Sequence, residues 1–189
     1  MDLRMERTKR SIINAFIELR AKKPLEKITV KELAELAYIN KATFYSHYHD
    51  IYDLSEQLEE EAIANILKNI PHPESIINNP RLCFLELNQA LTSQNSLTKI
   101  LFSDSRAAIL SARIEQGIKQ YVFATYPEYR ENVKWNIVLS FIIQGGFRAT
   151  QQFYTEEHNE EKKREAVQII GEMNECITQK FLYQELADM

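Results

Sequence analysis

Apolar residues recur every three or four positions along most of this chain, which is the spacing of amphipathic helices. The pattern over residues 7–22 stops before Pro24, which cannot continue a helix because it has no amide hydrogen. A second helix is predicted over about 29–36, with Thr29 as its N-cap and Glu32 completing a capping box. The residues predicted to face inward are Ile12, Ala15, Phe16 and Leu19 in the first helix and Val30, Leu33, Ala34 and Ala37 in the second.

A third, very short helix follows the interruption "YIN" at residues 38–40. Asn40 is suited to cap this helix, which is predicted over about 41–47. Phe44 and Tyr48 are four residues apart, so they share one face and can anchor the helix to a core.

A longer fourth helix is predicted from Ile51 to about Asn69, capped by Asp50. Its apolar stripe consists of Ile51, Leu54, Leu58, Ala62 and Ile66. Residues 69–80 contain three of the five prolines and mark the clearest boundary in the chain. Beyond that boundary, helices are predicted over about 80–93, 95–104, 105–124, 127–155 and 160–186.

The pattern therefore predicts an all-α fold in two parts. A three-helix domain covers residues 1–52, and the fourth helix (about 51–69) links it to a helical body over 70–189. Four glycines and five prolines in 189 residues are too few for the turns of an all-β protein. We find no β alternation, low-complexity tract or repeat.

Composition and charge narrow the functional classes. Cys83 and Cys176 do not suggest a disulfide framework, and neither a signal core nor a run of ~20 apolar residues appears, so we expect a reduced, cytoplasmic protein. Residues 1–57 hold ten basic and nine acidic residues, a balance of +1, whereas residues 58–189 hold thirteen and eighteen, a balance of −5. This asymmetry fits a DNA-facing N-terminal part on an acidic body.

The tight connection between the second and third helices is typical of a helix-turn-helix. In that motif the second helix enters the major groove, which is about 12 Å wide, and its outward side chains meet bases and phosphates. The candidate DNA-binding residues are Thr29, Asn40, Lys41, Ala42, Thr43, Tyr45, Ser46 and His47.

The stretch "TVKELAELAYINKATFYSHYHDIYDL" resembles the DNA-binding domain of TetR-type bacterial regulators. The resemblance begins at "RTKRSIINAF", continues through "KPLEKITVKELAELA" and reaches about Leu58. The tripeptide Thr43-Phe44-Tyr45, together with His47 and Tyr48, sits where the family places it. The resemblance implies a dimeric transcriptional regulator, usually a repressor, that binds double-stranded operator DNA and carries an all-helical body.

Three positions depart from the family's pattern. The turn usually contains glycine, and here it contains Tyr38. A β-carbon in a left-handed conformation costs roughly 1 kcal/mol, so we expect Tyr38 to adopt a different turn. Ile51 and His49 stand where the family commonly has lysines that meet phosphate. Phosphate contact is then expected either to be weaker or to rely on Lys41, Tyr45, His47 and an N-terminal arm containing Arg4 and Arg7.

Chemistry suggests roles for the candidate residues. Asn40 and Thr43 can reach base edges, Lys41 a guanine edge or a phosphate, and Ala42 a thymine methyl group. Tyr45 and His47 match family positions that donate hydrogen bonds to phosphate. Thr29 lies at a helix N-terminus, where it either meets phosphate or acts only as a cap.

His47 and His49 diverge on a helix, so no metal site is predicted, and no cofactor.

The body of the resembled family holds a pocket for a small-molecule effector, unknown here. Candidates for lining such a pocket are Phe84, Asn88, Phe102, Arg106, Trp135 and Gln144, with ordinary core or surface positions as the alternative. Gly145 and Gly146 inside one helix cost up to about 1 kcal/mol each, which indicates close approach of another helix or a kink beside a cavity.

The family also pairs its last two long helices with those of a second copy. Candidate residues of this dimer face are Ile137, Phe141, Gly145, Thr150, Ile169, Met173, Ile177 and Phe181, with a buried core face as the alternative.

No nucleophile–base pair, phosphate-cradling loop or metal-ligand spacing appears, so an enzyme is not expected and no catalytic residue is assigned. A TetR-like adaptor that acts through protein partners without a small-molecule ligand is the second reading of the chain.

Overall fold

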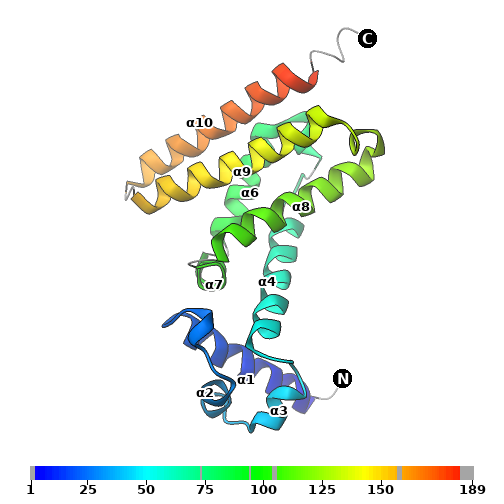
Figure 1. Cartoon of the computed structure of the whole chain (residues 1–189). Coiled ribbons are helices and arrows are strands. Elements are labelled where there is room, and N and C mark those ends of the chain that lie inside the picture. The colour runs from blue at the N-terminus through cyan, green and yellow to red at the C-terminus, as the bar shows by residue number, and fades with distance from the viewer. Residues whose placement is uncertain (1–2, 73, 94, 104–105, 157–158, 184–189) are drawn as a thin grey trace. The chain divides into compact units, whose positions relative to one another are not determined.

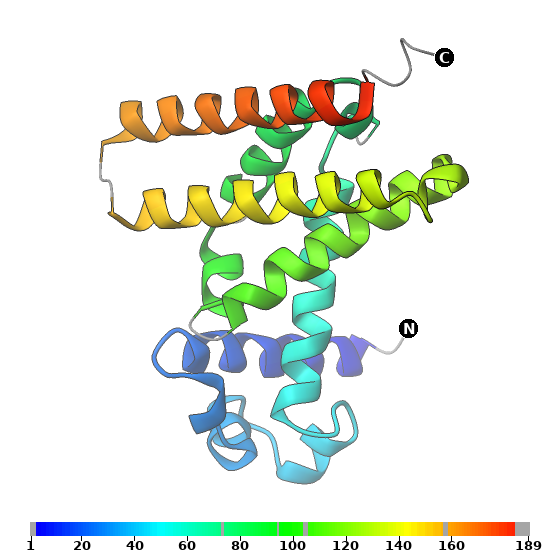
Figure 2. The same ribbon diagram turned by 45° about the horizontal axis from the view of Figure 1, so that its top comes forward.

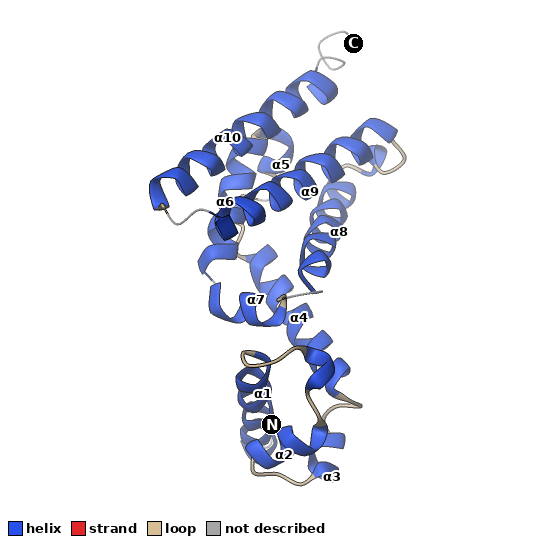
Figure 3. Cartoon of the chain, turned by 60° about the vertical axis from the view of Figure 1, so that its left-hand side comes forward, coloured by secondary structure: helices blue, strands red, loops and turns tan. Residues whose placement is uncertain are grey.

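The computed structural model of this chain describes residues 3–72, 74–93, 95–103, 106–156 and 159–183. Over these ranges the chain forms helices and no strand, which confirms the all-α prediction (Figure 3). The chain divides into two compact units, one made of residues 1–64 and 94–107 and the other of residues 65–93 and 108–189. No described helix combines the length and the apolar character needed to cross a bilayer.

The helices of the first unit (Figure 1) pack around an apolar core. Its elements are α1 (Leu3–Arg20), a 3₁₀ turn (Leu25–Lys27), α2 (Val30–Leu36), α3 (Lys41–Tyr45), the first part of α4 (Ile51–Lys68) and α7 (Asn95–Leu101). Ile12, Phe16, Leu33, Phe44 and Leu54 are completely buried, as the apolar pattern predicts. The other members of the predicted stripes are also buried, except Val30, which is half-buried.

Helix α1 begins at Leu3, four residues before the predicted start. Leu3 and Met5 are exposed, so the added turn does not extend the apolar face from which the helix was predicted. Residues 3–20 are thus one helix, and Arg4 and Arg7 lie on it rather than on an extended arm. Contact of these two arginines with DNA stays a prediction.

Two arginines attach the segment 94–107 to the first unit. The Arg20 guanidinium donates to the Ser103 carbonyl at 3.3 Å. Arg106 donates from Nε to Glu59 Oε1 at 2.9 Å and from Nη2 to Glu59 Oε2. The division of the chain therefore differs from the predicted boundary, which assigned everything after residue 70 to the body.

The second unit contains the longer helices. Its elements are the end of α4, α5 (Ser75–Asn78), α6 (Pro80–Ser93), α8 (Ala107–Thr125), a 3₁₀ turn (Pro127–Tyr129), α9 (Val133–Glu156), α10 (Glu160–Thr178) and a π-helical turn (Gln179–Tyr183). Helices α9 and α10 run antiparallel, side by side, and α6 packs across α10 (Figure 2). Residues 104–105 and 184–186 of the predicted helices lie outside the described residues.

The predicted helix over 127–155 is divided in the structure. Asn132 Oδ1 accepts hydrogen bonds from the amides of Lys134 and Trp135, at 2.9 and 3.2 Å, so α9 begins only at Val133. Within α9, a β-carbon on Gly146 would lie 2.9 Å from the Phe84 ring of α6. Gly146 therefore allows the close approach of another helix, which was one of its two predicted roles.

Candidate nucleic-acid interface

The turn between α2 and α3 is a Schellman motif. The Ile39 amide donates to the Ala34 carbonyl at 3.0 Å, and the Tyr38 amide donates to the Glu35 carbonyl at 3.2 Å. This motif requires a left-handed residue just after the helix, and Tyr38 occupies that place with φ 56°. The expectation that Tyr38 adopts a different turn is therefore wrong, because the two hydrogen bonds impose this geometry.

Helix α3 is held by hydrogen bonds among the residues predicted to read DNA. Asn40 Oδ1 accepts from the Thr43 amide at 2.7 Å and from Thr43 Oγ1 at 2.9 Å. Ser46 Oγ donates to the Thr43 carbonyl at 2.7 Å. These bonds stabilise a helix of only five residues. They leave the Asn40 amide nitrogen as its outward donor and the Thr43 hydroxyl as an acceptor.

The candidate reading residues face away from the core of the first unit. Asn40, Lys41, Ala42, Tyr45 and Ser46 are exposed. Thr43 and His47 are half-buried. On the opposite face, Phe44 and Tyr48 are buried with ring centroids 5.8 Å apart. Burial, and then the charge of Asp53, raises the pKa of the Tyr48 hydroxyl. One short helix thus separates an aromatic anchor from an outward polar tip.

Thr29 acts as the N-cap of α2. Its hydroxyl accepts a hydrogen bond from the Glu32 amide at 3.2 Å. The Glu32 carboxylate pairs with Lys23 Nζ rather than with the Thr29 amide, so only half of the predicted capping box forms. The Thr29 side chain remains exposed, which is compatible with either of its predicted roles.

The N-terminus of α4 is occupied by its own acidic caps. Asp50 Oδ1 accepts from the Asp53 amide at 2.8 Å, and Asp53 Oδ2 accepts from the His49 amide at 2.7 Å. Hydrogen bonds from Gln57 and from the His49 amide lower the pKa of Asp53, which keeps it ionised at neutral pH. Ile51 is buried. The N-terminus of α4 therefore presents acidic side chains and a buried isoleucine where the resemblance leads one to expect lysines.

A second exposed feature runs along α9 and α10. Side chains four residues apart form two apolar rows that are solvent-exposed in the single chain, so the alternative of a buried core face is wrong for most of them. Ile137 and Phe141 are each 62% exposed, and Met173 is 54% exposed. Gly145 continues the α9 row and has no atom within 4 Å of a β-carbon position. The remaining candidates are Ile169 and Phe181, which are exposed, and Thr150 and Ile177, which are half-buried.

The six candidate pocket residues are divided between the two units. Phe102 and Arg106 belong to the first unit, whereas Phe84, Asn88, Trp135 and Gln144 belong to the second. Trp135 stacks on Tyr129, with centroids 4.1 Å apart. Phe84 fills the space beside Gly146, and Asn88 is half-buried on α6.

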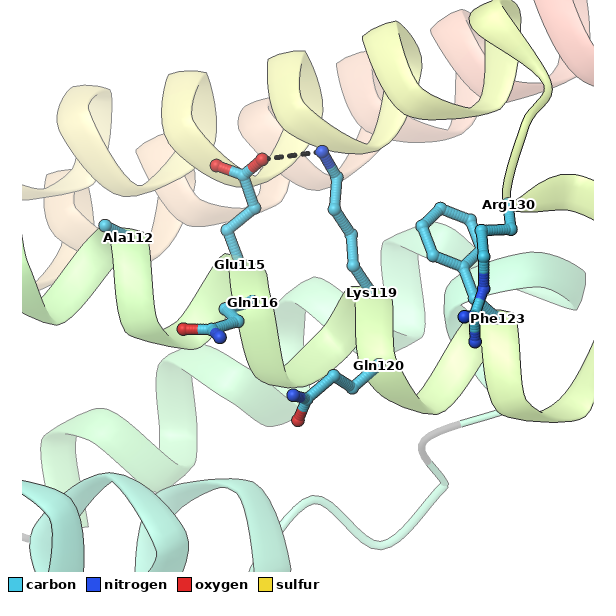
Figure 4. A pocket seen from close by; sticks show the side chains of 7 residues that line it. All are labelled: Ala112, Glu115, Gln116, Lys119, Gln120, Phe123 and Arg130. Atoms are coloured by element: carbon cyan, nitrogen blue, oxygen red, sulfur yellow. Dashed lines mark ion pairs between the residues drawn. The ribbon is translucent and has the colours of Figure 1, made fainter.

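An open groove of about 630 Å³ lies along α8 within the second unit (Figure 4). Its lining residues are Ala112, Glu115, Gln116, Lys119, Gln120, Phe123 and Arg130. None of them was a pocket candidate, although Gln144 Nε2 donates to Glu115 Oε2 at 2.7 Å.

Glu115 organises the polar side of this groove. Burial raises its pKa, but hydrogen bonds from Lys119, Ser140 and Gln144 outweigh burial and lower it, so the carboxylate is ionised at neutral pH. Lys119 Nζ lies 2.8 Å from Glu115 Oε1, and Ser140 Oγ donates to the same oxygen at 2.5 Å. Two polar pairs in the sequence could have indicated this cluster, because the members of each are four residues apart and share a helix face. These pairs are Glu115 with Lys119 on α8, and Ser140 with Gln144 on α9.

No group of three or more potential metal ligands comes together among the residues that the structure describes. Comparison of the chain with protein-family models and with curated protein sequences finds no match.

Proposed function

We propose that this chain is a dimeric DNA-binding transcriptional regulator of the TetR type. In this proposal it acts as a repressor that a small-molecule effector releases from a palindromic operator. The observation that carries the proposal is the outward polar tip of α3, which follows a tight turn and is anchored from behind by Phe44 and Tyr48. A short helix presented in this way suits the major groove, where side chains meet base edges.

The exposed apolar rows on α9 and α10 support the dimer in this proposal. Two copies that bury the same rows against each other would present two copies of α3 to two half-sites. The effector would act by binding one arrangement of the dimer better than the other. The groove along α8 is a place where such a molecule can bind, with both charges and amides available.

One observation favours the adaptor as a second candidate. Four of the residues predicted to line an effector pocket are engaged in packing or hydrogen bonds within the chain: Phe84, Arg106, Trp135 and Gln144. An adaptor would act through protein partners and would not need an effector. The two candidates differ in whether the purified chain binds duplex DNA sequence-specifically.

A gel-shift titration with the duplex upstream of the chain's own coding sequence tests the proposal. We expect specific binding that Tyr45→Ala and His47→Ala each weaken about tenfold or more, because each loses a hydrogen bond to a charged phosphate. Tyr45 is 56% exposed, so its loss should leave the thermal unfolding midpoint nearly unchanged. Tyr121→Ala, on α8, is the matched control and should bind as the unaltered chain does.

Failure of the unaltered chain to prefer its upstream duplex over a random one would remove the regulator and favour the adaptor. Specific binding that both variants retain in full would leave a DNA-binding protein but remove the phosphate contacts assigned to Tyr45 and His47.

A further inference from the structure

Tyr38 has a left-handed backbone conformation and an exposed aromatic side chain. Both are unfavourable, and no contact within the described chain compensates for them. Its φ of 56° is the single positive φ among non-glycine residues in the part of the chain that the structure describes. Its side chain is 95% exposed. A side chain at such a position is strained because its β-carbon approaches the following carbonyl, and glycine or asparagine would fit more easily.

The Schellman motif explains the backbone of Tyr38 but not its side chain. Both hydrogen bonds of the motif use main-chain atoms, so glycine at position 38 would form them equally well. The Tyr38 ring makes no ring–ring contact and its hydroxyl forms no hydrogen bond with any described residue. The phenol is therefore free to meet something outside the chain. Strained residues that the surrounding structure tolerates cluster at functional sites.

The position of Tyr38 points to what it meets. It lies two residues before Asn40, the cap that opens α3, in the loop that joins α2 to α3. A residue beside the tip of a helix in the major groove lies next to the sugar–phosphate backbone that borders the groove. A phenol suits that backbone, because its hydroxyl donates to a phosphate oxygen while its ring covers the sugar.

We propose that Tyr38 contacts the sugar–phosphate backbone of DNA beside the groove that α3 enters. This inference rests on the proposed function. Because a phosphate contact carries no sequence information, Tyr38 contributes equally to specific and nonspecific binding. Because the phenol is uncharged, it releases no counterion, unlike a lysine at the same interface.

The test is a titration of Tyr38→Phe and Tyr38→Gly with the upstream duplex and with a random duplex of the same length. We expect Tyr38→Gly to unfold at a higher denaturant concentration than the unaltered chain and yet to bind both duplexes about tenfold more weakly. Tyr38→Phe should keep the stability of the unaltered chain and lose several-fold in affinity. Neither variant should change the slope of log K against log salt concentration. Tyr121→Phe is the matched control.

The possible outcomes separate this inference from the proposed function. If the unaltered chain binds DNA and Tyr38→Gly binds equally or more tightly, the Tyr38 contact is refuted and the regulator stands. The contact is also refuted if the loss is confined to the upstream duplex, since the residue would then read sequence. If the unaltered chain binds no duplex, the proposed function fails and the contact fails with it.

Discussion

At the scale of single residues, Glu59 is a buried carboxylate neutralised by one guanidinium. Arg106 holds it with two hydrogen bonds, and Ser55 Oγ donates to the same carboxylate at 2.8 Å. The Glu59 side chain is 4% exposed, so its charge cannot be solvated if the pair is broken. Arg106 was a candidate for an effector pocket, and the structure instead engages it in this pair.

We expect Arg106→Ala to lower the free energy of unfolding by about 3 kcal/mol, because it leaves a buried carboxylate unpaired. Arg106→Lys should lose less, about 1 kcal/mol, since it keeps the charge but not the two-point geometry. Urea denaturation measures both values, and Arg130→Ala, an exposed arginine, is the control. A loss below about 0.5 kcal/mol for Arg106→Ala would show that the pair does not stabilise the fold.

A second residue-scale pair makes stability depend on pH. His72 Nδ1 lies 2.7 Å from Glu86 Oε1, and the His72 amide donates to Glu86 Oε2 at 3.2 Å. The hydrogen bond and the charge of Glu86 raise the pKa of His72 above its ordinary value. Because its pKa is higher in the folded chain, His72 binds a proton more tightly there than in the unfolded chain, and protonation of His72 therefore stabilises the fold.

The pair's contribution should therefore be complete below about pH 6.5, the ordinary pKa of histidine, and disappear as pH rises through the higher folded-state value. We expect His72→Gln to reduce the difference in unfolding midpoint between pH 6 and pH 8. Glu86→Gln should reduce it in the same way because it removes the partner charge. Equal pH profiles for all three proteins would contradict this assignment.

At the scale of elements, α9 and α10 each present an apolar row to solvent. In the proposed dimer these rows form the interface, since contiguous exposed apolar surface commonly marks an interaction site. Gly145 lies within the α9 row without a neighbour, so another helix can approach closely there.

We expect Phe141→Glu or Met173→Glu to raise the dissociation constant of the dimer by about 100-fold or more, since two-fold symmetry buries each new charge twice. Sedimentation at several protein concentrations measures this constant. Ala124→Glu, exposed on α8, is the control and should leave the dimer intact. A chain that sediments as a monomer before any substitution would overturn both the dimer face and the two-half-site mechanism.

At the scale of the whole molecule, the proposed DNA binding should depend on few phosphate contacts, because the chain carries a net charge of −4 and its first 57 residues only +1. Lys41 is the one lysine on α3, and it is exposed. The acidic caps and Ile51 leave the N-terminus of α4 without a cation to meet phosphate.

Lys41→Ala should reduce the slope of log K against log salt concentration by about 2 for a dimer, one phosphate contact being lost in each protomer. Titrations at four or more salt concentrations measure the slope. Lys68→Ala, exposed at the end of α4, should leave it unchanged. An unchanged slope for Lys41→Ala would assign this lysine to a base edge or to solvent instead of to phosphate.

What could be predicted from the sequence depends on the distance over which each interaction acts. Helix positions, the caps Asn40 and Asp50, and the buried faces of α1 and α4 arise from residues within about four positions of each other. Such local interactions leave a readable spacing in the chain. The outward tip of α3 was predictable for the same reason, since Phe44 and Tyr48 define its inward face.

The features that were not predicted depend on contacts between residues far apart in the sequence, or on the choice between alternative backbone conformations of a turn. Glu59 pairs with Arg106, and Glu115 pairs with Ser140. The two residues of each pair are far apart in the sequence, and only packing brings them together. The sequence alone determined that this chain is helical, the approximate positions of its long helices and which residues point out of α3, but it did not predict α5 or the break before Val133. Only the tertiary structure decided that Tyr38 accepts a left-handed turn, that the rows on α9 and α10 remain exposed and that the segment 94–107 joins the first unit, because packing chooses among conformations that local spacing leaves equally possible.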